Sequence, residues 1–337
     1  MKVSIVVPVY NVAPYIEQFA RSVFEQTLED IEYVFVDDCS PDSSMDILLS
    51  VLEEYPHRKQ KVKIVRHEKN MGIAVTRKDG YMKSTGEYMI YVDSDDYLEP
   101  RMLELMYAKA KEHDADMIVC DIYLYYKENC NVLKTAPKEE GENGEKIKDD
   151  IINRKVIPGL WCKLFRRSVL SENEALWPVR SYAEDVVIST YLAYSAKRIE
   201  YVNEPLYHYL YHDTSICNKN TKEQCLSNMD GYKRNIDVVV RFLKEKGVYD
   251  KYRFGVYLNK FYVKKLTMPF FRDKEFRKLW FDTYPELNRI LFWGDDIYKS
   301  SYRQKIWMVA IKTGLILKFK RRLQSKRFLP SPRWIFR

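Results

Sequence analysis

The first 125 residues alternate between short apolar segments and amphipathic segments, and this order restricts the fold more than any other feature of the chain. Apolar runs typical of buried strands occupy residues 4–9, 31–36, 62–66, 88–92 and about 117–123. Helical spacing is found between them, at residues 14–26, 43–55, 73–83 and 100–113. This alternation predicts an α/β fold with a doubly wound, mainly parallel sheet flanked by helices.

Residues 128–150 interrupt this pattern with a strongly polar segment. Gly141 and Gly144 would break a helix there, so we expect a mobile insertion. Strand and helix patterns resume at residues 155–220. Residues 1–220 are therefore predicted to form one α/β domain that carries this insertion.

The net charge of +8 is concentrated at the end of a helical region predicted for residues 221–337. Residues 301–337 contain eleven Lys or Arg and no Asp or Glu, whereas the other 300 residues carry 45 basic and 48 acidic side chains. Basic and apolar residues alternate in this tail, which indicates an amphipathic helix in peripheral contact with an anionic membrane. A helix packed on its own domain with a solvated basic face is the alternative. Without a recognition motif, the charge predicts no nucleic acid partner.

Cysteine and histidine spacing indicates the compartment. The six cysteines form no CxxC pair and the five histidines have no zinc spacing, which favours a reducing cytoplasm. The apolar stretch at residues 3–9 is too short for a signal peptide, and no run approaches the roughly 18 apolar residues needed to cross a bilayer. We therefore expect a cytoplasmic protein, peripheral at the inner face of the cell membrane.

Acidic side chains cluster after two predicted strands and at the start of a later helix. The three clusters are Asp37-Asp38, Asp93-Ser94-Asp95-Asp96 and Glu184-Asp185. Ligands of open α/β sheets bind at the carboxyl ends of strands, and closely packed carboxylates repel one another unless a cation holds them. The clusters together predict a site for a nucleotide diphosphate and Mg²⁺ or Mn²⁺, with a carboxylate base nearby. A solvated turn that caps the next helix is the alternative for residues 93–96 alone.

Several motifs, in order and at matching spacing, resemble the family 2 glycosyltransferases with the GT-A fold. They are Val7-Pro8-Val9-Tyr10-Asn11, Val36-Asp37-Asp38-Cys39-Ser40, Asn70-x-Gly72 with Arg77, Gly86-Glu87-Tyr88 before Asp93-Ser94-Asp95-Asp96, Trp161-x-Lys163-Leu164-Phe165, and Glu184-Asp185. They cover roughly residues 3–216, and the last third of the chain carries no motif that we can assign. The resemblance implies inverting, metal-dependent transfer of a sugar from a UDP-sugar to a hydroxyl of a glycan or lipid-linked acceptor in surface polysaccharide synthesis.

The resemblance also implies which residues bind the donor. Asp38 would accept a hydrogen bond from the base, and Asp93 would face the ribose or hold its loop. The complete set is Pro8, Tyr10, Asp38, Gly72, Arg77, Asp93 and Ser94. A core aromatic is the alternative for Tyr10, and a surface helix residue in an ion pair is the alternative for Arg77. Cys39 stands where the family often has Gly, which leaves the form of that turn open.

A metal site and a general base are implied in the same way. Asp95 would hold the cation that bridges the diphosphate, and His212 is a candidate second ligand whose alternative is a strand histidine without this role. Asp185 would be the base and Glu184 would orient it. The chemistry requires both parts, because a base takes the proton of the attacking hydroxyl while a cation offsets charge on the leaving diphosphate. Trp161 is expected either beside the acceptor or in the core.

Two other functions are alternatives to this one. A sugar-phosphate nucleotidylyltransferase would need a glycine-rich N-terminal phosphate loop, but residues 4–12 contain no glycine. A catalytically silent nucleotide-sugar-binding or scaffold protein could keep the fold for a partner. Intact Asp95 and Asp185 argue against a silent protein, and a donor-hydrolysis assay would separate the two.

Overall fold

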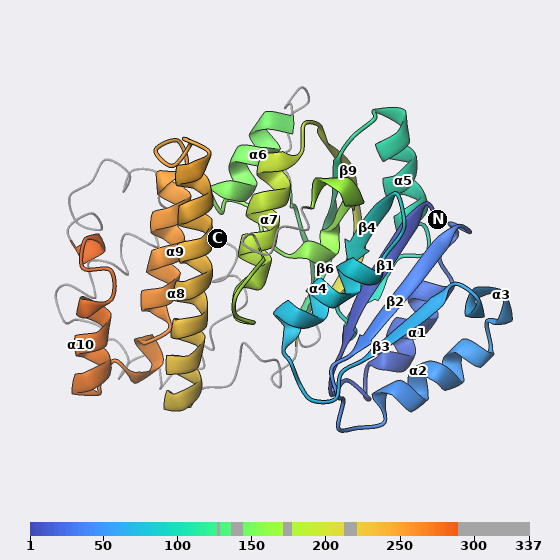
Figure 1. Ribbon diagram of the computed structural model, residues 1–337, viewed down its shortest axis with the longest axis horizontal. Coiled ribbons are helices and arrows are strands. Elements are labelled where there is room, and N and C mark those ends of the chain that lie inside the picture. The colour runs from blue at the N-terminus through green and yellow to red at the C-terminus, as the bar shows by residue number, and fades with distance from the viewer. Residues whose placement is uncertain (127–128, 136–143, 171–176, 212–220, 289–337) are drawn as a thin grey trace.

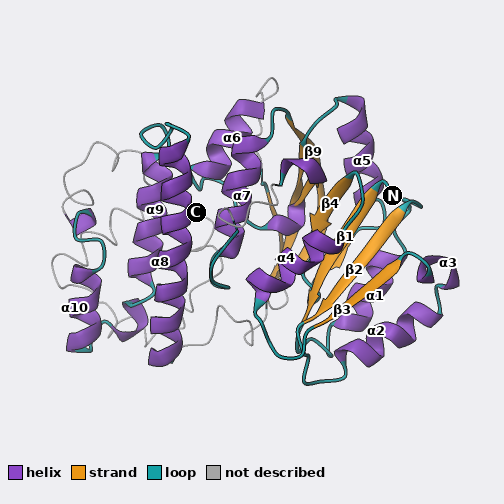
Figure 2. Ribbon diagram, viewed as in Figure 1, coloured by secondary structure: helices purple, strands orange, loops and turns teal. Residues whose placement is uncertain are grey.

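The computed structural model describes residues 1–126, 129–135, 144–170, 177–211 and 221–288. Helices α8, α9 and α10 stand away from the sheet, and α6 and α7 lie between them and the strands (Figure 1). Strands are gathered in one part of the molecule and the C-terminal helices in the other (Figure 2). The predicted tail at residues 301–337 and His212 lie outside the described residues.

The described residues contain a nine-stranded sheet with the order β3-β2-β1-β4-β8-β6-β9-β5, and β7 pairs with β6. The strands are β1 (Val3–Val9), β2 (Ile31–Asp37), β3 (Val62–Arg66), β4 (Tyr88–Tyr91), β5 (Tyr97–Leu98), β6 (Met117–Tyr126), β7 (Asn129–Leu133), β8 (Lys163–Arg166) and β9 (Ile199–Leu210). All seven residues of β1 and all four of β4 are buried. Burial on both faces explains why these strands read as unbroken apolar runs.

Parallel pairing dominates the first half of the sheet. β1 pairs in parallel with β2 and β4, and β2 pairs in parallel with β3. β8 lies antiparallel between β4 and β6, and β6 pairs in parallel with β9. The predicted α/β class with a mainly parallel sheet is confirmed. Because the chain runs from β1 to β3 on one side and returns to β4 on the other, the order reverses at β1, where such sheets bind ligands.

The helices follow the predicted pattern closely before residue 125. They are α1 (Ile16–Phe24), α2 (Ser44–Glu53), α3 (Pro56–Lys59), α4 (Ile73–Lys83), α5 (Met102–Glu112), α6 (Gly144–Ile152), α7 (Glu184–Ser195), α8 (Lys222–Glu245), α9 (Arg253–Lys265) and α10 (Lys274–Asp282). α4 packs on β1 and β2, and α5 packs on β6 and β9. No helix in the described ranges is both long enough and apolar enough to cross a membrane.

The prediction of a helix-free mobile insertion at residues 128–150 is wrong in two described segments. β7 pairs antiparallel with β6, and α6 begins at Gly144. Gly144 therefore stands at the start of the helix, where it interrupts no internal hydrogen bond. Ile147 and Ile151 lie one turn apart and are both buried, so this apolar spacing outweighs the polar composition of the segment.

Candidate active site

The carboxyl ends of β1 and β4 are joined by a hydrogen bond. Ser94 is buried, and its hydroxyl donates to the Pro8 carbonyl over 2.7 Å. Pro8 and Ser94 thus hold the two strand ends together at the point where the strand order reverses. Tyr10, two residues beyond Pro8, is 43% exposed, which excludes the alternative of a core aromatic.

Asp42 connects the loops that follow β1 and β2. Its carboxylate accepts hydrogen bonds from the Ala13 amide at 2.9 Å and from the hydroxyls of Ser40 and Ser44 at 2.7 and 2.5 Å. Ser40 in turn accepts the Asn11 amide over 2.8 Å. Partial burial favours a higher Asp42 pKa, but these hydrogen bonds lower it below its ordinary value. The two loops form one hydrogen-bonded frame at this edge of the sheet.

Three non-glycine residues in the site loops have left-handed backbone conformations. Asn11, Cys39 and Ala183 have φ angles of 55°, 58° and 63°. Each such residue costs about 1–2 kcal/mol, and such strain tends to occur at functional sites. The φ of Cys39 shows that its turn keeps the form that glycine would favour, although an exposed thiol replaces the glycine.

Asp38 holds the loop that connects β3 to α4. Its buried carboxylate accepts the Met71 and Gly72 amides at 2.7 and 2.8 Å, and it lies 2.7 Å from His67 Nδ1. His67 Nε2 lies 3.0 Å from the Asp79 carboxylate. Burial favours a lower His67 pKa, but the hydrogen bonds and charges of Asp38 and Asp79 raise it. His67 was not among the predicted site residues, although its position directly after β3 could have indicated it.

Gly72 brings this loop against the segment that precedes α7. Its φ of 85° lies in the left-handed region, and an added Cβ would lie 2.3 Å from the Ser181 hydroxyl oxygen. The backbone conformation favours glycine, and an added Cβ would also force the Ser181 hydroxyl to move. The motif residue Gly72 therefore joins two loops that are more than a hundred residues apart in the sequence.

Arg77 is a buried bridge between two of the acidic clusters. Its Nη1 donates to the Glu184 carboxylate and its Nη2 donates to Asp93 Oδ1 over 2.9 Å. The guanidinium lies 5.8 Å from the centre of the Tyr91 ring. Burial favours a lower Arg77 pKa, but the charges of Glu184, Asp93 and Asp185 raise it above its ordinary value. The alternative of a surface helix residue is wrong, because Arg77 ties α4, the end of β4 and the start of α7 together.

Glu184 and Asp185 form the first turn of α7, as predicted. Glu184 is buried, and its pKa is raised by that burial, with Arg77 opposing the rise and Asp185 adding to it. Asp185 is half-buried, and its Oδ1 accepts the Val186 amide over 2.8 Å. Arg77 therefore fixes Glu184, and the helix places Asp185 beside it.

The last residue of the 93–96 cluster is structural. Asp96 is buried and accepts the Tyr207 hydroxyl at 2.6 Å and the Leu210 amide at 2.7 Å. Burial and then the Asp95 charge raise its pKa well above the ordinary value. Tyr207 stacks on Trp161 with ring centres 4.7 Å apart, and Trp161 is buried. Trp161 therefore belongs to the core behind this loop.

Asp95 lies between Asp93 and Asp96, partly buried, after the end of β4. Burial and the neighbouring Asp93 charge raise the Asp95 pKa to about 7. Within the described ranges, no three His, Cys, Asp or Glu side chains form a group that could hold a metal. Mg²⁺ commonly binds one or two carboxylates and completes its shell with water and substrate phosphates. His212, the other predicted ligand, lies outside the described residues.

Comparison with known proteins identifies the family. The family model for glycosyl transferase family 2 matches residues 4–173. The chain belongs to this family. EpsH of Bacillus subtilis (strain 168), a protein named as a glycosyltransferase, is 30% identical over 74% of this chain and 72% of its own length. Membership supports glycosyltransferase activity and confirms the resemblance found in the sequence.

Two further relatives extend the comparison. TarP of Staphylococcus aureus (strain N315), named a poly(ribitol-phosphate) beta-N-acetylglucosaminyltransferase, is 28% identical over 74% of each chain. The crystal structure of residues 1–349 of S. aureus TarS in complex with UDP-GlcNAc superposes with a TM-score of 0.57 at 22% identity. That match covers 71% of this chain and 67% of the TarS chain. The TarS match confirms the GT-A fold.

Proposed function

We propose that this protein is an inverting, metal-dependent hexosyltransferase that moves a sugar from a UDP-sugar to a hydroxyl of a glycan or lipid-linked acceptor. The buried Arg77 bridge carries the proposal, because it brings the 93–96 cluster and the Glu184-Asp185 pair to one edge of the sheet. The role would be in surface polysaccharide synthesis, and the support for polymer synthesis is TarP, whose name gives poly(ribitol-phosphate).

The donor would lie across the carboxyl ends of β1, β2 and β4. Exposed Tyr10 and the frame held by Asp42 would flank the base, and Asp38 would contact it from the loop that it already holds. Gly72 would shape this loop, and Arg77 would support Asp93 from behind. Asp95 would hold Mn²⁺ or Mg²⁺ against the donor diphosphate, where the cation offsets the negative charge of the leaving group.

Asp185 would accept the proton of the acceptor hydroxyl during transfer. The hydroxyl oxygen forms a bond to C1 of the sugar from the face opposite the diphosphate, and the C1–O bond to the diphosphate breaks, so that UDP leaves with the bonding electrons. This displacement inverts the configuration at C1. Glu184, held by Arg77, would keep Asp185 in position without taking the proton.

In this proposal, the charge of the chain determines where in the cell the protein acts. The eleven basic residues of the 301–337 tail would hold the protein at the anionic inner face of the cell membrane, where lipid-linked acceptors are found. Apart from this contact the protein would be cytoplasmic, which agrees with the lack of CxxC spacing among its six cysteines.

Transfer or donor hydrolysis should be measured with purified protein against a panel of nucleotide sugars, in Mn²⁺, in Mg²⁺ and in EDTA. We expect turnover with a UDP-sugar that EDTA abolishes and added metal restores, and we expect Asp95→Ala to abolish it. Full activity in EDTA would contradict the role of Asp95. Binding of UDP without transfer or hydrolysis of any donor would favour the catalytically silent alternative.

A further inference from the structure

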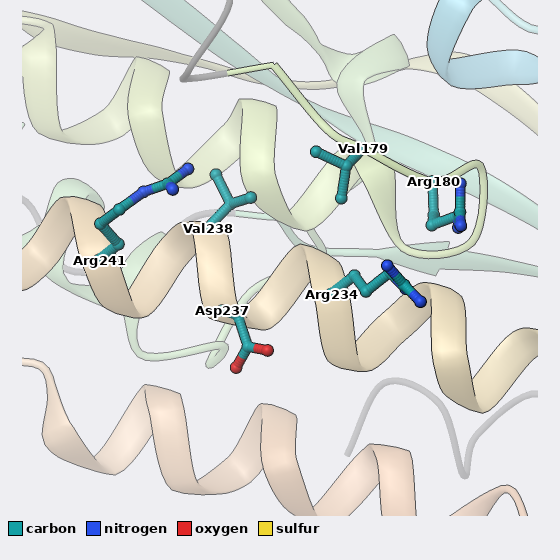
Figure 3. Close-up of a pocket in the computed structure, with 6 residues that line it drawn as sticks. All are labelled: Val179, Arg180, Arg234, Asp237, Val238 and Arg241. Carbon is teal, nitrogen blue, oxygen red and sulfur yellow. The ribbon is translucent and has the colours of Figure 1, made fainter.

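A cavity of about 300 Å³ lies between the segment that precedes α7 and the middle of α8. Figure 3 shows Val179 and Arg180 on the segment, above the helix. The remaining lining residues come from α8 and are Arg234, Asp237, Val238 and Arg241. α8 carries none of the family motifs, and none of the proposed donor-binding residues lines this cavity.

Three guanidinium groups give the cavity a positive character. Asp230 holds two of them in place, because it accepts two hydrogen bonds from Arg234 at 2.8 and 2.9 Å and lies 3.6 Å from Arg180. Asp237 also lines the cavity, but its carboxylate points away from the upper segment (Figure 3). Burial raises the pKa of Tyr284, and the charge of Asp237 adds to that rise.

The chemistry of these groups favours a phosphate ligand. With three arginines and Asp237, the lining carries a net charge of +2, and Asp230 reduces this to +1. Guanidinium groups present planar pairs of N–H donors that match phosphate oxygens, and such charge-assisted hydrogen bonds are stronger than neutral ones. The facing side chains of Val179 and Val238 supply apolar walls beside the charged groups (Figure 3).

Asn235 fastens the upper segment to α8. Its buried side chain accepts the amides of Val179 and Arg180 at 3.0 and 3.3 Å and donates to the carbonyls of Arg180 and Tyr182 at 2.8 and 2.9 Å. Five residues separate Arg180 from Asp185, which limits the distance between their Cα atoms to about 18 Å. The cavity is therefore held at a fixed place next to the segment that leads to the proposed base.

We propose that this cavity binds a phosphate group of the acceptor, which Arg180 and Arg234 would hold at one end of the cavity while Arg241 at the other end adds positive charge (Figure 3). The phosphate would belong either to a soluble or polymeric phosphodiester or to the headgroup of a lipid-linked acceptor. This inference rests on the proposed function for the identity of the ligand as acceptor, whereas phosphate binding itself needs no turnover.

Calorimetry tests the site in solution, with glycerol 3-phosphate as the charged probe and glycerol as the neutral control. Binding to phosphatidylglycerol vesicles tests whether the phosphate belongs to a lipid headgroup, and phosphatidylcholine vesicles are the control without net charge. The variant R234Q/R241Q removes two charges from the cavity, and K233Q/K244Q removes two exposed charges from the same helix outside the lining. UDP binding is measured in every protein as the readout for the donor site.

We expect R234Q/R241Q to weaken glycerol 3-phosphate binding by about tenfold or more, since hydrogen bonds to charged groups are lost. K233Q/K244Q should bind as the unchanged protein does, and UDP affinity should be the same in all three. Arginine-dependent binding to phosphatidylglycerol vesicles alone would also support the site and identify a lipid phosphate. The proposal is overturned if neither probe binds, or if the lysine variant loses as much affinity as the arginine variant.

Discussion

At the scale of single residues, Asp185 is the group whose proposed chemistry can be tested most directly. Asp185→Asn replaces the proton acceptor by an amide of nearly equal volume. Turnover should fall by about 10² or more while UDP affinity is kept, because the carboxylate is needed only in the transition state. Steady-state kinetics and calorimetry check this, with Asp250→Asn on an exposed loop as the matched control. Normal turnover of Asp185→Asn would assign the base to another carboxylate.

His67 makes stability depend on pH through its two carboxylate partners. The folded-state pKa is raised, so the charged form contributes stability that is complete below the unfolded value of about 6.5. This contribution is lost as the pH rises through the folded value. The loss in unfolding free energy caused by His67→Gln should therefore be largest below pH 6.5 and smallest in alkaline solution.

Urea unfolding from pH 5.5 to 9 checks the sign of this effect. His57→Gln on α3, an exposed residue, serves as the control and should give a difference that changes little with pH. A deficit of His67→Gln that grows as the pH rises would contradict the interpretation, because it would mean that Asp38 and Asp79 favour the neutral ring.

The sequence predicts which residues belong to the site better than it predicts which residues they contact. The clusters at Asp93 and Glu184 were found because each follows a strand or begins a helix. The bridge between them was not found, since Arg77 and Glu184 are 107 residues apart and no local pattern encodes their contact. Ser94 was expected to face the donor, but it holds the Pro8 carbonyl, a partner that only the strand order reveals.

At the scale of elements, the start of α4 depends on Gly72 for two separable reasons. Gly72→Ala would place a Cβ in a left-handed backbone conformation and within 2.3 Å of Ser181 Oγ. Gly247 has a φ of 69° but no atom within 4 Å of an added Cβ, so Gly247→Ala reports the backbone cost alone. We expect Gly247→Ala to lose about 1 kcal/mol and Gly72→Ala to lose clearly more.

The double variant Gly72→Ala with Ser181→Gly separates the two costs further. Removing the Ser181 side chain should return the Gly72→Ala loss to about that of Gly247→Ala, because only the backbone cost is then left. Thermal unfolding of the four proteins provides the measurement. Equal losses for Gly72→Ala and Gly247→Ala would show that the close approach to Ser181 is not a constraint.

Element positions were mostly predicted well before residue 125, whereas β7 and β8 beyond it were not predicted. β1 and β2 each have seven residues in extended apolar runs, and both were predicted within one residue of their bounds. β8 has four residues, and its antiparallel place between β4 and β6 depends on pairing partners far away in the chain. β7 was missed because its five residues are mostly exposed, so they lack the alternation that marks a half-buried strand.

At the scale of the whole molecule, one hydrophobic core joins the sheet to the C-terminal helices. Met229 and Ile236 of α8 and Val263 of α9 are buried in the same cluster as Val6 of β1. The predicted boundary at residue 220 therefore separates strand-rich from helical sequence, but packing continues across it. This continuity explains how α8, which carries no motif, can hold the segment that leads to Asp185.

At the same scale, the net charge is +11 in residues 301–337 and −3 in the other 300 residues. We predict that this asymmetry determines membrane binding. Changing Lys318, Lys320, Arg321 and Arg322 to Gln removes four charges, or about 4 kcal/mol of attraction if each contributes about 1 kcal/mol at an anionic surface. Binding to phosphatidylglycerol vesicles in a sedimentation assay should therefore fall steeply. Added salt should have the same effect on the unchanged protein, since screening acts within about 8–10 Å.

A second variant distinguishes the tail from net charge in general. Changing Arg272, Lys274, Arg277 and Lys278 to Gln, in and beside α10, lowers the net charge by the same amount within the described residues. It should leave vesicle binding nearly unchanged, because those charges lie among acidic neighbours such as Asp273 and Glu275. Both variants should keep activity on a short water-soluble acceptor, because the proposed catalytic carboxylates lie far upstream. If the unchanged protein fails to bind vesicles, or if both variants lose binding equally, the tail is not a membrane contact and its basic face is only solvated.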